Sequence, residues 1–409
     1  MRFKNAKQDI QDILSWFSEA FSSTSFKFFS SFIINFIQLG KEVHTSSMVQ
    51  ALTPFTKSLS SFTRFLGNNI WEAEELVSIS LKNFFSSLHI HTRSVVFLIL
   101  DDTIARKSGK KIPGCGWHKD HSQKMANVFG HQWVLSALLY RDFLMPLWTK
   151  LYHPKKAKGC GRFQTKITLA KKILKTLKLP VPCKLYLLAD SWYWSKQLAM
   201  LCQKLGYHMI SQLKHNSVIW MGARRIKISA LANNRTLYRE VSLPLYGKNK
   251  TLKIAKIIGV IKGLGKVAVV IVKEKKKKPR YLVSTNIYLP AIDVVKYYAK
   301  RWKIEQMIKD LKQRLGFGDY QVRNLQAIQR HVALSLLSYF VLVFLKILQW
   351  LRDKNISLDS SIRLLASYVR KHILVEQISV TLRYMKIRFK QNILESYLEK
   401  TLCVKSARV

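Results

Sequence analysis

Apolar positions in the first 90 residues recur at helical spacing, with large aromatic side chains three or four positions apart. This pattern is typical of helices that pack one face into a core. Two shorter helices are predicted near Ser46–Leu52 and Ser58–Leu66, and Thr53-Pro54 separates them. The pair fits a helix-turn-helix or a plain helical hairpin equally well. The aromatic positions are Phe17, Phe21, Phe28, Phe29, Phe32 and Phe36.

The pattern changes at Val95, where short continuous apolar runs replace the helical spacing. Val95–Leu100 has the length of a buried strand, and Asp101-Asp102-Thr103 follows it directly. A basic loop with glycines is expected from Arg106 to Gly116. Two further strands, Gln132–Tyr140 and Phe143–Tyr152, are predicted to form a hairpin.

A second buried strand, Lys184–Ala189, ends at another acidic residue, Asp190. Amphipathic helices are predicted before it (163–178) and after it (Ser195–Leu205), and Tyr207–Leu213 is a further strand. Three strands, then helix, strand, helix and strand is an α/β layer order. In such sheets functional side chains gather at strand ends, where both aspartates are expected.

Residues 215–288 differ from the preceding part because they contain short β-rich runs and many lysines. We expect a β-rich insertion on one side of the sheet. Its lysines, including the run Lys273–Lys278, are either a solvated face or a DNA-binding track, and we favour DNA. From Leu289 the chain is predicted to be helical almost to its end. The expected strands are Leu237–Leu243, Leu252–Ile261, Val267–Val272 and Arg280–Thr285.

One apolar stretch, Val332–Trp350, is nearly long enough to cross a membrane. Lys346 interrupts it, Arg330 and His331 precede it, and no second such stretch occurs. We therefore predict a buried helix of a core or of a dimer interface, and no membrane partner.

The charge balance points to a polyanionic partner. The chain has 69 Lys and Arg against 23 Asp and Glu, a formal net charge of +46. Such an excess is self-repelling unless a polyanion neutralises it, and nucleic acid is the usual one. Five dispersed cysteines without a CxxC pair argue against a disulfide framework and favour a reducing cytoplasm.

Candidate chemistry lies in the segment after Ile292, in Tyr298, Arg301, Glu305 and Lys312. On one helix these four would fall within roughly 60° of one another. A carboxylate flanked by cations is often only a surface ion pair. With Asp102 and Asp190 at the ends of buried strands, however, three carboxylates can hold two Mg²⁺ ions for phosphoryl transfer.

These motifs resemble bacterial insertion-sequence transposases of the DDE class, of the cut-and-paste type with a Tyr-Arg-Glu-Lys signature. The resemblance rests on Asp-Asp-Thr after one strand, Leu-Ala-Asp after a later one, and the Tyr-x2-Arg-x3-Glu-x6-Lys segment followed by Leu315-Gly316. It covers roughly residues 40–345. Gaps of 88 and 115 residues separate the three carboxylates, and the second gap contains the β-rich insertion.

The resemblance implies an α/β fold: an RNase H-like mixed sheet flanked by helices, with a β-rich insertion and helical N- and C-terminal regions. The chain is expected to divide into five parts. They are a DNA-binding region (1–90), the first part of the catalytic core (91–214), the insertion (215–288), the second part of the core with the Glu-bearing helix (289–350) and a C-terminal region for dimerisation (351–409).

The resemblance also assigns roles to residues. Asp102, Asp190 and Glu305 would be catalytic and hold two Mg²⁺ ions, for which Mn²⁺ can substitute. Tyr298, Arg301 and Lys312 would contact DNA phosphates near the cleaved end.

Two choices of residue stay open. Adjacent strand residues face opposite sides, so only one of Asp101 and Asp102 should ligate a metal. We choose Asp102 because it directly precedes Thr, as in the family. The resemblance also implies that an aromatic residue of the insertion contacts a flipped base, and Trp220, Tyr238 and Tyr246 are all candidates.

The implied reaction is cleavage at transposon ends, through a hairpin that is reopened, and strand transfer into target DNA. The partners would be double-stranded DNA, as terminal inverted repeats and target, and a second copy of the chain. The expected location is the bacterial cytoplasm, in association with the nucleoid. The alternatives are a catalytically inactive, DNA-binding derivative and a DDE-type nuclease that does not rejoin DNA.

Overall fold

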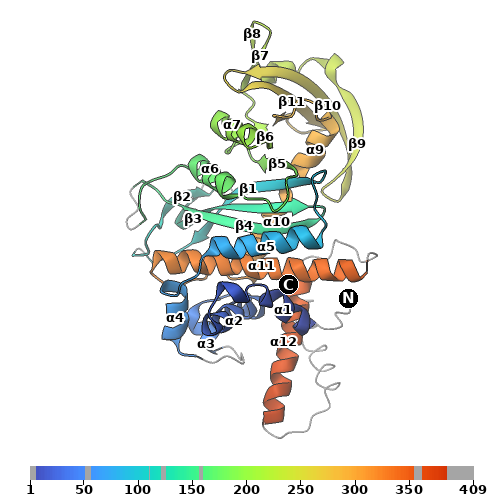
Figure 1. The fold of residues 1–409 in the computed structure, drawn as a ribbon. Helices are drawn as coiled ribbons and strands as arrows, with labels where there is room; N and C mark the ends of the chain where they lie inside the picture. The colour runs from blue at the N-terminus through green and yellow to red at the C-terminus, as the bar shows by residue number, and fades with distance from the viewer. Residues whose placement is uncertain are drawn as a thin grey trace. The chain divides into compact units, whose positions relative to one another are not determined.

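The computed structural model describes residues 6–50, 57–109, 111–120, 126–155, 160–353 and 362–384. The chain divides into two compact units (Figure 1). Met1–Leu88 and Lys309–Val409 form the first, which we call the helical unit. His89–Ile308 form the second, which we call the sheet unit.

The helical unit is built around one long helix, α11 (Leu325–Arg352), which contacts α1, α2, α4, α5 and α12. The phenylalanines at helical spacing form much of its core, and Phe29, Phe32 and Phe36 are fully buried. Residues 51–56, which include Thr53-Pro54, lie between α3 and α4 and outside the described residues, so the helix-turn-helix alternative stays untested. The other helices are α1 (Ala6–Ser15), η1 (Ser18–Ala20), α2 (Ser23–Leu39), α3 (Thr45–Gln50), α4 (Leu59–Gly67), α5 (Ala73–Ser87) and α12 (Ile362–Tyr384).

Helix α11 contains the apolar stretch that was considered as a membrane span. Among the described residues it is the one helix long and apolar enough to cross a membrane, and 83% of its most apolar window is buried inside the protein. The buried Arg330 donates hydrogen bonds to the backbone carbonyls of Leu66 and Trp71. These features are those of a core helix.

The described residues of the sheet unit form one 12-stranded sheet in the order β2-β3-β1-β5-β6-β12-β11-β10-β7-β8, with β4 paired to β3 and β9 to β10. Strands β1, β5 and β6 are parallel, and β3 is antiparallel to β1. The order β4-β3-β1-β5-β6 agrees with the expected RNase H-like mixed sheet. The strands are β1 (Val95–Arg106), β2 (Gly116–Asp120), β3 (Ala126–Tyr140), β4 (Phe143–Tyr152), β5 (Lys184–Ala189), β6 (His208–Leu213), β7 (Val218–Met221), β8 (Arg224–Lys227), β9 (Arg239–Leu245), β10 (Lys248–Ile261), β11 (Gly265–Glu274) and β12 (Arg280–Ser284).

The β-rich insertion extends the main sheet. Its last strand, β12, pairs with β6, so Tyr281 lies opposite Leu213. Strands β11 and β10 continue the same ladder outward. Two short helical segments, α8 (Ile228–Leu231) and η2 (Arg235–Leu237), interrupt it.

The expected end of the first strand at Leu100 was wrong. Strand β1 continues to Arg106, because β3 pairs with it from Phe97 as far as Arg106. Asp101 and Asp102 therefore lie inside the strand. The second strand predicted from the sequence was expected to begin at Gln132. In the structure this strand, β3, already begins at Ala126, and its first residues pair with β2.

Helices pack against both faces of the sheet. Helix α6 (Lys166–Thr176) contacts β3 and β4, and α7 (Lys196–Lys204) contacts β6. Helix α9 (Ala291–Ala299) contacts β6, β10, β11 and β12. The ring of Phe97 on β1 packs edge-on against Tyr297 of α9, with centroids 4.8 Å apart.

The single helix expected for Tyr298, Arg301, Glu305 and Lys312 was also wrong. Helix α9 ends at Ala299, and α10 (Trp302–Arg314) begins after a tight turn. In that turn the amides of Lys300 and Arg301 donate to the carbonyls of Tyr297 and Tyr298, three residues back.

Candidate active site

Asp101 and Asp102 lie on opposite faces of β1, as strand geometry requires. Asp101 shares its face with Phe97, which packs against α9. Asp102 faces the side covered by α6, where Lys166 reaches it. Both carboxylates are largely buried, with 17% and 18% of the side chain exposed.

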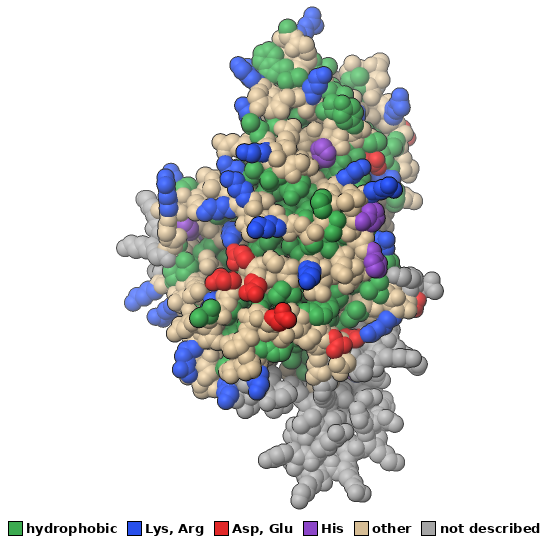
Figure 2. Space-filling model, viewed as in Figure 1, with side chains coloured by type: hydrophobic (Ala, Val, Ile, Leu, Met, Phe, Trp, Pro, Cys, Tyr) green, Lys and Arg blue, Asp and Glu red, His purple; other side chains and the backbone are tan. Residues whose placement is uncertain are grey.

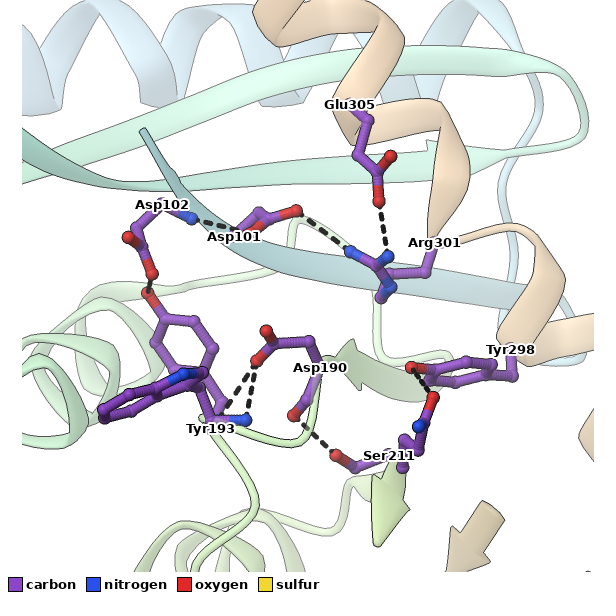
Figure 3. A network of polar contacts seen from close by, with 10 residues as sticks. Asp101, Asp102, Asp190, Tyr193, Ser211, Tyr298, Arg301 and Glu305 are labelled. Atoms are coloured by element: carbon purple, nitrogen blue, oxygen red, sulfur yellow. Dashed lines mark hydrogen bonds and ion pairs between the residues drawn. The ribbon is translucent and has the colours of Figure 1, made fainter. Parts of the chain in front are cut away.

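Arg301 joins two carboxylates from different elements (Figure 3). One guanidinium nitrogen donates to Asp101 Oδ2 at 2.9 Å, and the other donates to Glu305 Oε1. Arg301 stands in the turn between α9 and α10, so the break between the helices places its side chain between β1 and the first turn of α10. Glu305 is thereby held next to strand β1.

Asp102 is held by three side chains on the other face. Gln132 Nε2 donates to its Oδ2 at 2.6 Å and Lys166 Nζ does so at 2.8 Å. The Tyr193 hydroxyl donates to Oδ1 at 3.1 Å. These contacts tie β1 to β3, to α6 and to the turn after β5.

Asp190 directly follows β5 and closes the turn that leads to α7. Its Oδ1 accepts from the backbone amides of Trp192 and Tyr193, at 2.9 and 3.3 Å. Its carbonyl accepts from Ser211 Oγ of β6 at 2.8 Å. The pairing of β1 with β5 brings this turn to the same region as Asp101 and Asp102, as Figure 3 shows.

The three aspartates share a buried, electrostatically coupled environment. Burial raises the pKa of Asp101 to about 7, although Arg301 opposes the shift. Burial also raises the pKa of Asp190, and the charge of Asp102 raises it further. Carboxylates crowded in this way favour an additional cation, because it offsets both burial and mutual repulsion.

Oxygen donors of this kind are the ligands that Mg²⁺ prefers, so the donor chemistry fits a magnesium site. Across the described ranges, however, no group of three or more His, Cys, Asp or Glu side chains lies close enough to hold a metal ion. Asp102 is paired with Lys166, and Glu305 with Arg301. A metal held by both carboxylates would require these side chains to turn from their present partners.

The other residues of the signature lie in different surroundings. Tyr298 is 7% exposed, its hydroxyl is 3.5 Å from Gln212 Oε1, and its ring centroid is 6.0 Å from the Arg301 guanidinium carbon. Burial raises the pKa of Tyr298 to about 12. Lys312 is exposed on α10, seven residues beyond Glu305.

The three aromatic candidates of the insertion differ in exposure and neighbours. Tyr246, at the turn between β9 and β10, is 45% exposed and lies edge-on to Trp302, which follows Arg301, with centroids 6.3 Å apart. The Tyr238 hydroxyl donates to the carbonyl of Ala232. Trp220 lies on β7 and is half-buried.

Several neighbours of the carboxylates were not identified from the sequence. Gln132, Lys166 and Tyr193 contact Asp102, and Asp101 contacts Arg301. Each contact joins residues at least 30 positions apart, so local patterns carry no signal for it. On the face drawn in Figure 2, several acidic side chains lie close together, whereas Lys and Arg are scattered over the face.

The chain matches the protein-family model described as Transposase DDE domain over residues 96–341. The match begins in β1, includes Asp101, Asp102, Asp190 and Glu305, and ends within α11. A search of curated proteins gives no match.

Proposed function

Because the chain belongs to the transposase family with a DDE domain, we propose that it cuts DNA at the ends of a mobile element and joins them to target DNA. The observation that carries the proposal is the link through Arg301 between Asp101 on β1 and Glu305 on α10. With Asp190 at the end of the neighbouring strand, acidic groups from three elements gather in one buried region.

Asp102, Asp190 and Glu305 are the proposed holders of two Mg²⁺ ions, with Mn²⁺ as a substitute. When bound, such ions activate the attacking oxygen and stabilise the leaving oxygen of a phosphodiester. The chain's own cations hold the carboxylates until then. Lys166 pairs with Asp102 and Arg301 with Glu305, so a bound metal would replace these cations at the two carboxylates, and the cations could then contact DNA phosphates.

Tyr298 is proposed to position Arg301 rather than to contact DNA itself, because its ring is buried beside the guanidinium. Arg301 and the exposed Lys312 are the proposed phosphate contacts.

Tyr246 is the proposed aromatic contact for a flipped base. It is exposed, its neighbour Trp302 is 46% exposed, and Lys250 Nζ is 5.4 Å from its ring centroid. Aromatic faces beside cations are suited to unstacked bases and their phosphates.

The remaining assignments are proposals from the resemblance. Residues 1–90 would bind the terminal inverted repeats, and residues 351–409 would contribute to a homodimer on DNA. The protein would act in the bacterial cytoplasm, at the nucleoid.

Glu305→Gln tests the proposed function. The change keeps the shape of the side chain and removes its charge, so we expect nicking and joining of terminal-repeat DNA with Mg²⁺ to fall at least about 1000-fold. DNA affinity measured in EDTA should change little, because Glu305 is not one of the proposed phosphate contacts.

Glu240→Gln is the matched control, since Glu240 is exposed on β9 and pairs only loosely with Lys253 at 3.9 Å. It should cut and join like the unaltered chain. Cutting that survives in Glu305→Gln would contradict the site assignment. Cutting without joining would favour a nuclease, and DNA binding without cutting by the unaltered chain would favour an inactive derivative.

A further inference from the structure

Trp192 is an exposed aromatic side chain beside the carboxylates, and the proposed reaction gives it no role. It is 60% exposed, although it lies in the short turn whose amides bind the Asp190 carboxylate. The same turn places the next residue, Tyr193, in a fully buried position against Asp102. The contacts of Asp190 and Tyr193 therefore hold the turn in place, while the indole of Trp192 is exposed to solvent.

Two lysines approach this indole from different elements. Lys166 Nζ, at the start of α6, is 5.6 Å from the indole centroid, and Lys214 Nζ, just after β6, is 5.9 Å from it. Lys166 is also 5.6 Å from the ring centroid of Tyr152 and pairs with Asp102. Lys214 is exposed and forms no ion pair with any residue that the structure describes.

An exposed aromatic face with ammonium groups beside it is suited to an unpaired nucleotide. The indole can stack on a base, and the lysines can bind the flanking phosphates. A paired base inside a duplex does not offer its face in this way. Lys166 lies between the indole and Asp102. A nucleotide bound to the indole would therefore be separated from the Asp102 carboxylate only by the side chain of Lys166.

We propose that Trp192, Lys166 and Lys214 form a binding site for one unpaired nucleotide of a DNA strand that leaves the duplex beside Asp102 and Asp190. We call this set the indole site. The inference rests on the proposed DNA substrate and adds a contact for the displaced strand. It is separate from Tyr246, which lies beside Trp302.

The test is binding of two DNA probes to the full chain in EDTA, where no cutting occurs. One probe is a blunt duplex, and the other is the same duplex with a short single-stranded overhang that carries 2-aminopurine. We expect the unaltered chain to bind the overhang probe more tightly and to quench its fluorescence by stacking. Trp192→Ala should lose about tenfold in affinity for the overhang probe alone, and Trp192→Phe should retain most of it.

Lys214→Gln should weaken binding of the overhang probe and reduce its salt dependence by about one phosphate contact. Tyr288→Ala is the matched control, because Tyr288 is 87% exposed in the sheet unit and lies outside the indole site. It should bind both probes normally.

Equal affinity of Trp192→Ala and the unaltered chain for the overhang probe would overturn the indole site. An equal loss on both probes, or the same loss in Tyr288→Ala, would also overturn it. The result is distinguishable from failure of the proposed function. A chain that never cuts DNA but loses overhang binding in Trp192→Ala keeps the indole site, and a chain that cuts while Trp192→Ala binds normally loses only that site.

Discussion

A guanidinium between two carboxylates holds both of them, because its removal would leave both negative charges without their cation. Arg301 has this position between Asp101 and Glu305, whereas Asp102, one residue along the same strand, is fixed by Lys166, Gln132 and Tyr193. Neighbouring aspartates thus have different partners, and their substitution should have different effects.

Asp102→Asn should abolish Mg²⁺-dependent cutting, as expected for a ligand. Asp101→Asn should lower cutting only about tenfold, since Arg301 loses one charged hydrogen bond of roughly 1.5 kcal/mol and keeps Glu305. Cutting rates at increasing Mg²⁺ concentration separate the two, because loss of a ligand also raises the Mg²⁺ requirement. The reverse order of the two variants would make Asp101 the ligand.

His131 makes the stability of the sheet unit depend on pH. It is fully buried on β3, its Nε2 is 2.8 Å from the carbonyl of Pro113, and burial lowers its pKa to about 4. Between pH 6.5 and 4 the unfolded chain binds a proton that the folded chain does not. The free energy of unfolding should therefore fall as pH falls, by about 2 kcal/mol at pH 5 relative to pH 7.

Urea unfolding at pH 7 and pH 5 measures this change. In His131→Gln, whose amide can still donate to Pro113, the difference between the two pH values should shrink by about that amount. An unchanged difference would show that other groups are responsible.

At the level of elements, the long pairing of β1 with β3 depends on a residue without a side chain. A Cβ on Gly130 would lie 2.1 Å from the backbone carbonyl oxygen of Ala105, and backbone cannot move aside as a flexible side chain can. Gly130→Ala should therefore lower the free energy of unfolding by about 1–3 kcal/mol.

Gly67→Ala is the matched control, because a Cβ there meets nothing within 4 Å. It should leave stability unchanged or raise it slightly. Chemical denaturation of both variants checks the prediction, and equal stability of Gly130→Ala and the unaltered chain would contradict the close contact with β1.

The elements predicted well from the sequence are those whose own residues determine them. Strand β5 was expected as Lys184–Ala189 and is found with those bounds, since its apolar run is continuous and Asp190 ends it. The break between α9 and α10 could not be predicted, because no Gly or Pro marks it and the helical pattern continues through it. The contacts of Arg301 with Asp101 and Glu305 lie at this turn, and the first of them spans 200 residues of sequence.

Contacts between residues far apart in the sequence also limited what could be predicted of the candidate site. Asp102, Asp190 and Glu305 could be predicted as site residues because each lies in a recognisable motif. Lys166 and Gln132 could not, because their importance comes only from the pairing of β1 with β3 and from the packing of α6.

For the whole molecule, the net charge of +46 dominates the expected behaviour in solution. Affinity for terminal-repeat DNA should fall steeply with salt, with a log–log slope steeper than about −5. Fluorescence anisotropy measured at constant pH, between about 50 and 300 mM salt, gives this slope. A nearly flat plot would contradict a long DNA footprint.

The lysines of the insertion can be tested in the same titration. Lys275 and Lys276 are exposed at the turn after β11, whereas Lys277 pairs with Glu274. Replacing Lys275 and Lys276 with Gln should make the slope shallower by about two if they bind phosphates. An unchanged slope would assign them to a solvated face.

The pairing of β12 with β6 also sets the smallest version of the sheet that a protein engineer could build. Leu213 and Tyr281 are direct partners, so a short hairpin turn could replace everything between them. The shortened chain would keep the strands that carry Asp101, Asp102 and Asp190. It would lose β11 as the neighbour of β12, and the apolar Leu282 and Val283 would then lie on an open edge. Exposed strand edges pair with strands of other molecules, so the shortened protein should aggregate. Lysine or proline substitutions on the exposed edge of β12 should prevent this.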